Sequence, residues 1–179
     1  MDITYKIQFH SLWHCGSGLS AGADVDNLVV KDKQGMPFVP GKTMKGLIRE
    51  AVEDYIDFTH DESNEKLKEE TFGIEGELTG VAYFGDATLG PHEYKNIVAT
   101  QSQQYLYTKI TTTAIEEDGT AQDHSLRSME AVVPCTLEGV IRNVPEDMGA
   151  IICKSLGLIK RIGQKRNRGL GRCDVSVKK

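Results

Sequence analysis

The chain has 179 residues, of which 39% are hydrophobic and 26% charged, and its formal net charge at pH 7 is −5. This length predicts a single domain over residues 1–179, and this composition is ordinary for a globular protein. No apolar run approaches the ~18 residues that a membrane-spanning helix needs. The first residues also lack the pattern of a signal peptide, so we expect a cytoplasmic protein with no membrane partner.

The four cysteines, at positions 15, 135, 153 and 173, form no close pair of the kind that zinc ribbons use. Because no secretion signal is present, disulfides are not expected either. We predict buried or half-buried thiols and no cysteine metal site.

Charge is distributed unevenly along the chain. Residues 154–179 contain nine Lys or Arg and one acid, a net of +8, which leaves −13 for the preceding 153 residues. Segment 50–80 holds eleven acids and two lysines. A basic end on an acidic chain favours a polyanion track on one face. Within the acidic insertion at about 58–77, residues 58–70 are expected to be solvated and irregular or weakly helical, and the insertion could be disordered or contact another subunit.

The first half of the chain predicts two strands and a helix. Alternating apolar residues predict a strand over 3–14, with His10 and His14 on its polar face. A loop rich in small residues then leads to a short strand at 28–31. Apolar residues at helical spacing predict a helix over 42–57.

The second half predicts a buried strand at 80–89 and a β-hairpin over about 104–131 that turns at Asp118-Gly119. A core strand over 131–142, a helix from Pro145 to about 160 and a last strand at 173–177 follow. The flanks of the hairpin are polar, so it should project from the core. The order of the other elements approximates βαββαβ. We therefore predict an α+β fold with a ferredoxin-like (RNA-recognition-type) core and a projecting β-hairpin.

The Pro40-Gly41 bend opens the predicted helix with Lys42, Thr43 and Lys45. Helix N-termini offer unpaired N–H groups and a positive dipole end, so they bind phosphate well. Two lysines in the first turn oppose that dipole unless an anion meets them. This pattern predicts a phosphate-binding helix end. Arg49, further along the helix, could contact phosphate or pair with Glu53 four residues on.

A glycine-rich loop supplies a second phosphate-binding pattern. Glycines let a backbone approach phosphate closely, and interleaved cations supply charge. An ordinary turn beside a solvated helix end would look similar, but the density of arginine favours binding. The loop residues are Gly163, Lys165, Arg166, Arg168, Gly169, Gly171 and Arg172.

The loop over 16–26 carries Asp24 and Asp26. A carboxylate on a flexible loop can act as a general base or hold a divalent cation near a phosphodiester, although aspartates also form turns. His10 and His14 could contact RNA or serve as structural histidines.

Four segments, in order, resemble the RAMP superfamily. Residues 35–49 are similar to its G-x-P-x-I-P-G-S-S-L-K-G motif, and Phe72-Gly73 with residues 80–86 resembles its F-G…G-x-L-x-F-x-D-A segment. Residues 163–172 look like its C-terminal glycine-rich loop, and 109–132 are similar to the thumb hairpin of the backbone subunits of type III CRISPR effectors.

The resemblance implies an RNA-recognition-type core that stacks along a guide RNA, with a thumb that displaces one nucleotide of the guide–target duplex about every six nucleotides. Residues 26–32 resemble the family's D-x-P-V-x-[RK]-D motif, with Leu28 in place of proline. This implies that Asp26 is catalytic, with a divalent cation, expected to be Mg²⁺, and that target RNA is cleaved. Implied partners are guide RNA, target RNA, copies of the same subunit and other CRISPR effector subunits.

The resemblance assigns RNA contact to Lys42, Thr43, Lys45, Arg49 and the glycine-rich loop. Two alternatives stay open. One is a non-catalytic subunit that only holds guide RNA. The other is a guide-processing endoribonuclease, which fits less well because such enzymes usually contain two such domains and often a catalytic histidine. Asp86 is expected to support the fold and not to catalyse.

Overall fold

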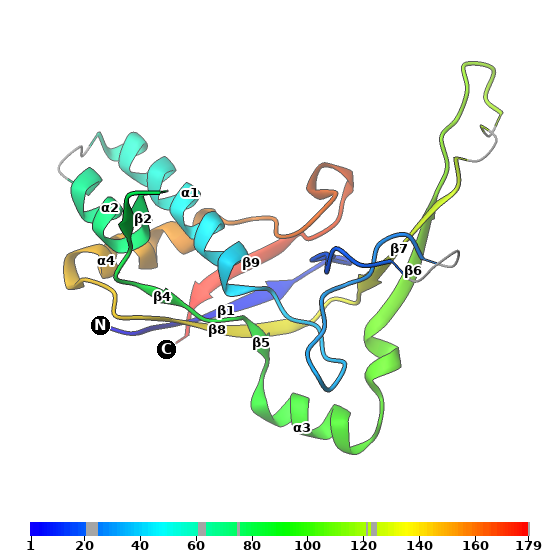
Figure 1. Cartoon of the computed structure of the whole chain (residues 1–179), viewed down its shortest axis with the longest axis horizontal. Helices are drawn as coiled ribbons and strands as arrows, with labels where there is room; N and C mark the ends of the chain where they lie inside the picture. The colour runs from blue at the N-terminus through cyan, green and yellow to red at the C-terminus, as the bar shows by residue number, and fades with distance from the viewer. Residues whose placement is uncertain (21–24, 61–63, 75, 121, 123–124, 179) are drawn as a thin grey trace.

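The computed structural model describes the chain except residues 21–24, 61–63, 75, 121, 123–124 and 179. It is a mixed α/β structure with antiparallel sheets (Figure 1). The main sheet has the order β4-β8-β1-β9, and β5 also pairs with β8. Its strands are β1 (Ile3–Phe9), β4 (Tyr83–Phe84), β5 (Thr88–Leu89), β8 (Thr136–Arg142) and β9 (Cys173–Val177).

The central strand β1 has alternating burial. Ile7 lies opposite Leu137 of β8 and Val175 of β9, and all three side chains are buried. Strand β1 ends at Phe9 and is therefore shorter than the predicted strand over 3–14. Trp13 instead forms an isolated bridge with Val132, on a different sheet.

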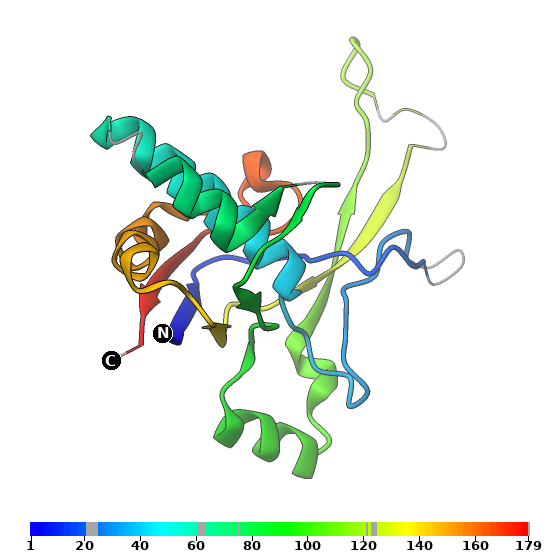
Figure 2. The ribbon, with the colours of Figure 1, turned by 60° about the vertical axis from the view of Figure 1, so that its left-hand side comes forward.

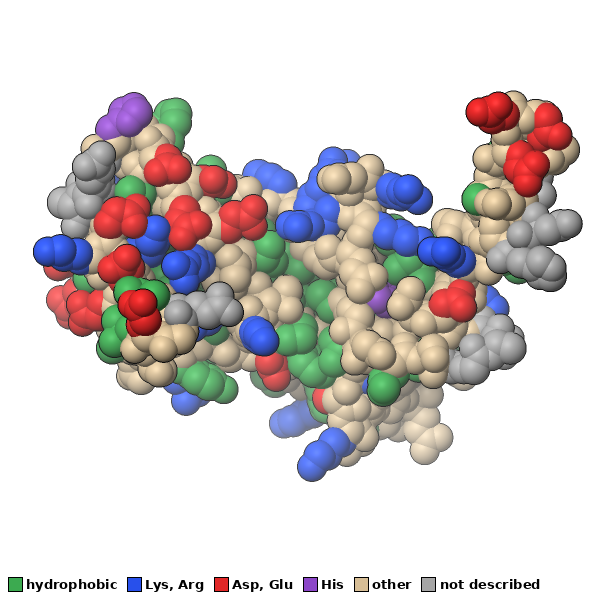
Figure 3. All heavy atoms as spheres, turned by 45° about the horizontal axis from the view of Figure 1, so that its top comes forward, with side chains coloured by type: hydrophobic (Ala, Val, Ile, Leu, Met, Phe, Trp, Pro, Cys, Tyr) green, Lys and Arg blue, Asp and Glu red, His purple; other side chains and the backbone are tan. Residues whose placement is uncertain are grey.

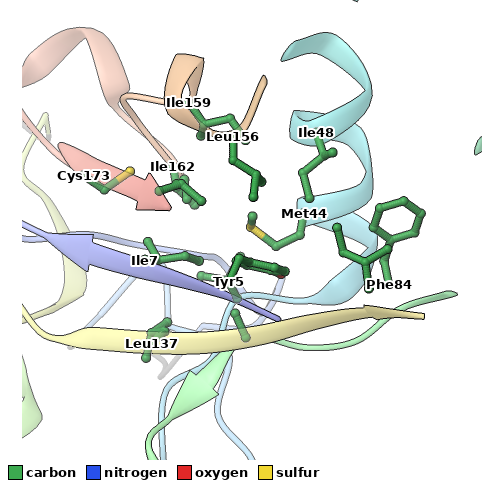
Figure 4. Packing of buried hydrophobic residues seen from close by; sticks show 14 of the residues in the cluster. Tyr5, Ile7, Met44, Ile48, Phe84, Leu137, Leu156, Ile159, Ile162 and Cys173 are labelled. Atoms are coloured by element: carbon green, nitrogen blue, oxygen red, sulfur yellow. The ribbon is translucent and has the colours of Figure 1, made fainter. Parts of the chain in front are cut away.

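Helices cover one face of the sheet, where α1 (Gly41–Thr59) and α4 (Glu146–Ser155) lie together (Figures 1 and 2). The 3₁₀ turn η3 (Leu156–Leu158) continues from α4. Figure 4 shows Met44 and Ile48 of α1 facing Leu156, Tyr5 and Ile7 in the core. The helix predicted over 42–57 is confirmed, and the one predicted to reach about 160 is divided between α4 and η3.

Part of the acidic insertion is a regular helix with an exposed face, where a solvated, irregular or weakly helical segment was expected. Helix α2 (Glu65–Phe72) leads into the short strands β2 (Gly73–Ile74) and β3 (Leu78–Thr79). The Lys68 ammonium lies 2.7 Å from Glu65 and 3.3 Å from Glu53 of α1, and its residue is buried. These ion pairs dock α2 on α1, which local polarity does not reveal.

The strand predicted over 80–89 is present only as the short strands β4 and β5, both paired with β8. Gly85 still donates to the carbonyl of Val140 in β8 at 2.9 Å, and the interruption falls at Ala87, which exchanges two backbone hydrogen bonds of 2.9 Å with Val39. Helix α3 (Pro91–Ala99), which the sequence analysis did not predict, follows and leads to the 3₁₀ turn η2 (Gln103–Leu106). Pro91 in the first turn, with Glu93 beside it, is the start signal that could have revealed this helix.

A two-stranded antiparallel hairpin projects from the body (Figure 1). Its strands are β6 (Tyr107–Thr112) and β7 (Arg127–Val132), in a register that pairs Tyr107 with Val132. At its described tip, Asp118 accepts hydrogen bonds from the backbone and hydroxyl of Thr120, at 2.9 and 2.7 Å. The predicted hairpin is therefore present, and the predicted strand over 131–142 is split into the end of β7 and β8. Among the described residues, no helix is long and apolar enough to cross a membrane.

Candidate nucleic-acid interface

Helix α1 begins at Gly41, directly after Pro40. The backbone N–H of Gly41 donates to Oδ1 of Asp86 at 2.7 Å, so Asp86 satisfies one of the otherwise unpaired donors of the first turn. This confirms the expected supporting role of Asp86. The first turn contains no acid of its own. Lys42 is exposed there and Lys45 half-buried, which leaves positive charge at the positive end of the helix dipole.

The glycine-rich loop is held by the segment that follows β1. The N–H of Gln164 donates to the carbonyl of His14 at 2.8 Å, and that of Gly171 donates to Leu12 at 2.7 Å. Gly163 has φ +97°, and a Cβ there would lie 2.3 Å from the His14 oxygen, so only glycine fits. The loop is therefore a shaped element and not a slack connection.

The basic side chains of the loop surround a cavity of 640 Å³. Arg166 and Arg168 belong to a single 3₁₀ turn, η4 (Arg166–Arg168), and both are exposed. The lining residues are Arg161, Gly163, Gln164, Lys165, Arg166, Asn167 and Arg168. Four cations and no acid face this hollow, as an anion-binding surface requires.

A second cavity, of 230 Å³, joins the loop to the first turn of α1. Thr43 of α1 lines it together with Gly163 and Arg166, although about 120 residues separate the two segments in sequence. The structure thus brings together two of the segments that the sequence singled out for phosphate binding. The full lining is His14, Cys15, Gly16, Pro40, Thr43, Leu47, Gly163, Gln164 and Arg166.

Arg49 does not line either cavity. Its Nε donates to Oε1 of Glu53 at 3.1 Å, and a terminal nitrogen donates to the carbonyl of Gly73 at 3.1 Å. These contacts match the alternative of a fold-supporting arginine, and its contact with phosphate stays a prediction.

The two histidines have different environments. His10 is exposed, and its Nε2 lies 2.9 Å from Oδ2 of Asp174, whose Oδ1 accepts from Nζ of Lys160 at 3.0 Å. Hydrogen bonds from His10 and then Lys160 lower the pKa of Asp174. His14, predicted on the polar face of a strand, is completely buried, because β1 ends before it and the chain turns inward.

His14 connects two parts of the site. Its Nδ1 lies 2.6 Å from the carbonyl oxygen of Glu130, so Nδ1 carries the proton. Its own carbonyl accepts from Gln164 of the glycine-rich loop. Its Nε2 is buried and has no hydrogen-bond partner among the described residues. His14 is thus a structural link between the loop and the hairpin.

Asp26 lies at the base of the hairpin, a region we define by Ser128, Met129 and Glu130 of β7. Oδ2 of Asp26 accepts from the N–H of Ser128 at 2.7 Å, and the N–H of Asp26 donates to the Ser128 carbonyl at 3.0 Å. The residue is exposed. This arrangement holds the carboxylate at the point where the hairpin leaves the body. Asp24, the other candidate in this loop, is outside the described residues.

Glu130, which was not predicted from the sequence, fixes the segment that follows Asp26. Its Oε1 accepts from Nζ of Lys31 at 2.7 Å, and its Oε2 accepts from the N–H of Val29 at 3.1 Å. Lys31 also lies 3.9 Å from the centroid of the Tyr107 ring, a cation–π contact with β6. The sequence signal that could have indicated Glu130 is its place as a single acid within the otherwise apolar run 129–132.

Basic groups gather in the middle of one face of the molecule (Figure 3). Acidic side chains lie to both sides of them, over the α1–α2 end and at the hairpin tip. A polyanion would therefore be attracted to the centre of this face and repelled at its two ends.

The thiols are ill-suited to catalysis. Cys15 and Cys173 are buried, while Cys135 and Cys153 are half-buried, and all are free, as predicted. Burial raises the pKa of Cys15 to about 12, so it is a neutral thiol near pH 7. Among the described residues no group of three or more His, Cys, Asp or Glu could hold a metal ion.

A family model for the RAMP superfamily matches residues 6–174. The chain belongs to this superfamily, as its motifs predicted. Solved structures share the fold. A chain of the type III-B Cmr-beta complex bound to cognate target RNA superposes with a TM-score of 0.73 at 13% identity, covering 99% of this chain and 97% of that one. A chain of the apo complex gives 0.71 at 12% identity, covering 100% and 98%. No curated protein matches the sequence.

Proposed function

We propose that this chain is a guide-RNA-binding backbone subunit of a type III CRISPR effector, and that it cleaves complementary target RNA. The observation that carries the proposal is the cavity shared by the first turn of α1 and the glycine-rich loop, close to the hairpin base that holds Asp26. Membership of the RAMP superfamily and the fold shared with the Cmr-beta subunits support it.

We propose that the main sheet is a ferredoxin-like core and the hairpin a thumb. The order β4-β8-β1-β9, with α1 and α4 on one face, fits a βαββαβ core. On this assignment guide phosphates follow the track from Lys42 and Thr43 to the loop cations. The hairpin, whose base is tied to that loop through His14, reaches across the guide–target duplex.

The chemistry follows from Asp26. A nucleotide displaced by the hairpin leaves the helical geometry and can align its 2′-oxygen with the adjacent phosphorus and the departing 5′-oxygen. Asp26 accepts the 2′-hydroxyl proton as the new P–O bond forms. The P–O5′ bond breaks, and the 5′-oxygen takes a proton from water. The products are a 2′,3′-cyclic phosphate and a 5′-hydroxyl. Base pairing supplies the sequence specificity.

A divalent cation fits this site if phosphate oxygens of the RNA supply ligands besides the carboxylate. Mg²⁺ is held in many proteins by one or two carboxylates together with substrate phosphates. The exposed carboxylate of Asp26 and phosphate oxygens of the RNA would hold it, and it would neutralise charge on the phosphate. Ser128 keeps one carboxylate oxygen oriented by its N–H group.

A second candidate function, a subunit that holds guide RNA without cleaving target, is supported by a separate observation. Because the Asp26 carboxylate already accepts from Ser128, it has a structural task that needs no chemistry, as in a subunit that only holds the guide. A denaturing gel of labelled target RNA incubated with the assembled guide complex and Mg²⁺ separates the two functions. Products spaced by about six nucleotides support cleavage along a filament. Intact target, with guide binding demonstrated, would make this a holding subunit.

A further inference from the structure

The end of α1 that lies away from the proposed RNA track carries an unusual apolar surface. Phe58 is 84% exposed and Leu158 of η3 is 50% exposed, and with Tyr55 they line a cavity of 510 Å³. Asp54 of α1 and Lys154 of α4 complete its lining. We call this set the α1–η3 surface. A large aromatic side chain left almost fully exposed beside a cavity is typical of an interaction site.

The charges around this surface indicate what it binds. Asp54 and Asp57 stand in the last two turns of α1, whose last turn has no basic residue. Acids at a helix C-terminus lie at the negative end of the dipole, so they are unfavourable unless cations approach from outside. Lys154 is a cation in the cavity lining, but Asp54 and Asp57 outnumber it, so this end of α1 disfavours a nucleic acid or an anionic lipid surface. A partner that brings Lys or Arg relieves this charge.

The surface continues as a groove of 220 Å³ between α1 and the segment after η3. Leu47, Ala51 and Ile159 give the groove apolar lining, with acids on the α1 side and cations opposite. The cations are Lys160, Arg161 and Arg166, and Arg166 also lines the cavity of the glycine-rich loop. A segment lying in this groove would therefore run from the exposed Phe58 towards the RNA track.

We propose that the α1–η3 surface docks a segment of a different protein subunit that presents an apolar anchor flanked by Lys or Arg. The inference rests on the proposed function at one step. In that function guide RNA occupies the loop cations, which are the densest run of Lys and Arg in the chain, so a second copy could offer this surface only scattered lysines such as Lys95. A subunit of different sequence can bring a basic segment that RNA does not engage.

The test places the photo-crosslinking residue p-benzoyl-phenylalanine at position 58 in the complete, purified ribonucleoprotein. Irradiation should join it to a non-identical protein subunit, through a peptide that contains Lys or Arg. The same residue at Tyr105, which is 73% exposed on η2, serves as the control and should not label that peptide. Crosslinks to RNA, to another copy of this chain or to nothing would overturn the proposal.

A pair of variants supplies the quantitative readout, with the crosslinked subunit titrated onto complex that lacks it. Phe58→Ser should weaken its binding about 30-fold, as loss of an aromatic hot spot does. Tyr105→Ser should leave binding unchanged. Equal binding by both variants would overturn the proposal. Guide RNA affinity, measured on the same preparations, tests the proposed function separately, because Phe58 lines neither cavity of the RNA track.

Discussion

Oδ2 of Asp26 lies 2.7 Å from the backbone nitrogen of Ser128, and the backbone of Asp26 returns a hydrogen bond to the carbonyl of the same residue. These two bonds attach the loop after β1 to the base of a hairpin about a hundred residues later in the chain. The carboxylate is therefore held by the element that we propose displaces the scissile nucleotide. The Asp26–Ser128 contact thus concerns both the position of the carboxylate and its proposed role as a base, and substitutions at Asp26 can separate the two.

Replacing Arg168 and Arg172 together with alanine should weaken guide RNA binding. Because each cation that meets a phosphate releases counterions, the slope of log affinity against log salt should fall by about 1 for each residue. Filter binding at several salt concentrations measures both quantities. Lys95→Ala, which removes an exposed cation from α3, should leave them unchanged. An unaltered slope in the double variant would move the RNA track elsewhere.

Glu130→Ala should slow target cleavage and destabilise the fold. It removes the acceptor of the Val29 N–H and of Lys31, whose ion pair with Glu130 is partly open to solvent, and we expect a loss of about 1–2 kcal/mol. Urea unfolding and cleavage rates measure the two effects. Glu138→Ala is the matched control. Glu138 lies on β8 of the main sheet, and its carboxylate also pairs with a lysine, Lys178, at 2.7 Å. Equal effects from both variants would contradict a specific role for Glu130.

His14→Ala and His10→Ala should differ sharply in stability. His14 is fully buried and donates to Glu130, so its removal leaves a cavity and a carbonyl without its donor, at a cost of about 2–4 kcal/mol. His10 is exposed, and its removal should cost at most about 0.5 kcal/mol. Denaturant midpoints measure both. A larger loss for His10 would contradict the assignment of His14 as the link between loop and hairpin.

Asp32 should contribute to the acid sensitivity of the fold. Partial burial alone would raise its pKa, but hydrogen bonds from the Tyr94 hydroxyl and from the N–H groups of Met36 and Gln34 lower it below its usual 3.8. Since the folded pKa is depressed, this stabilisation is complete above pH 3.8 and is lost as the pH falls through the folded pKa.

Thermal melts of wild type and Asp32→Asn across this range check the sign. The variant should have the lower Tm at neutral pH, and the difference should shrink below pH 3.8. Asp57→Asn, at an exposed position, controls for the change in net charge. A difference that stays constant with pH would show that Asp32 contributes no titrating interaction.

Local signals predicted the segments of this fold better than their contacts. The stripe of Met44, Ile48 and Val52 determines α1, and the Asp118-Gly119 pair marks the hairpin, because these patterns depend on near neighbours in sequence. The break between β4 and β5 was not predictable, because it depends on hydrogen bonds between Ala87 and Val39.

The candidate site likewise has some features that the sequence predicts and others that depend on tertiary contacts. Glycines and arginines at 163–172 are visible in the sequence, and so is the helix end at Lys42. The inward turn that buries His14 and the bonds from Glu130 to Val29 and Lys31 are tertiary, and only the structure reveals them. The sequence therefore predicted residues that could contact RNA, but not the residues that hold them in position.

The most direct test compares Asp26→Asn with Asp26→Ala in single-turnover cleavage of target RNA. Asparagine keeps an oxygen that can accept from Ser128 but cannot take the 2′-hydroxyl proton. We predict that both variants bind guide RNA like wild type and that both cleave at least about 100-fold more slowly. Wild-type cleavage by Asp26→Asn, with failure only of Asp26→Ala, would show that Asp26 acts by holding the hairpin base and that another group is the base.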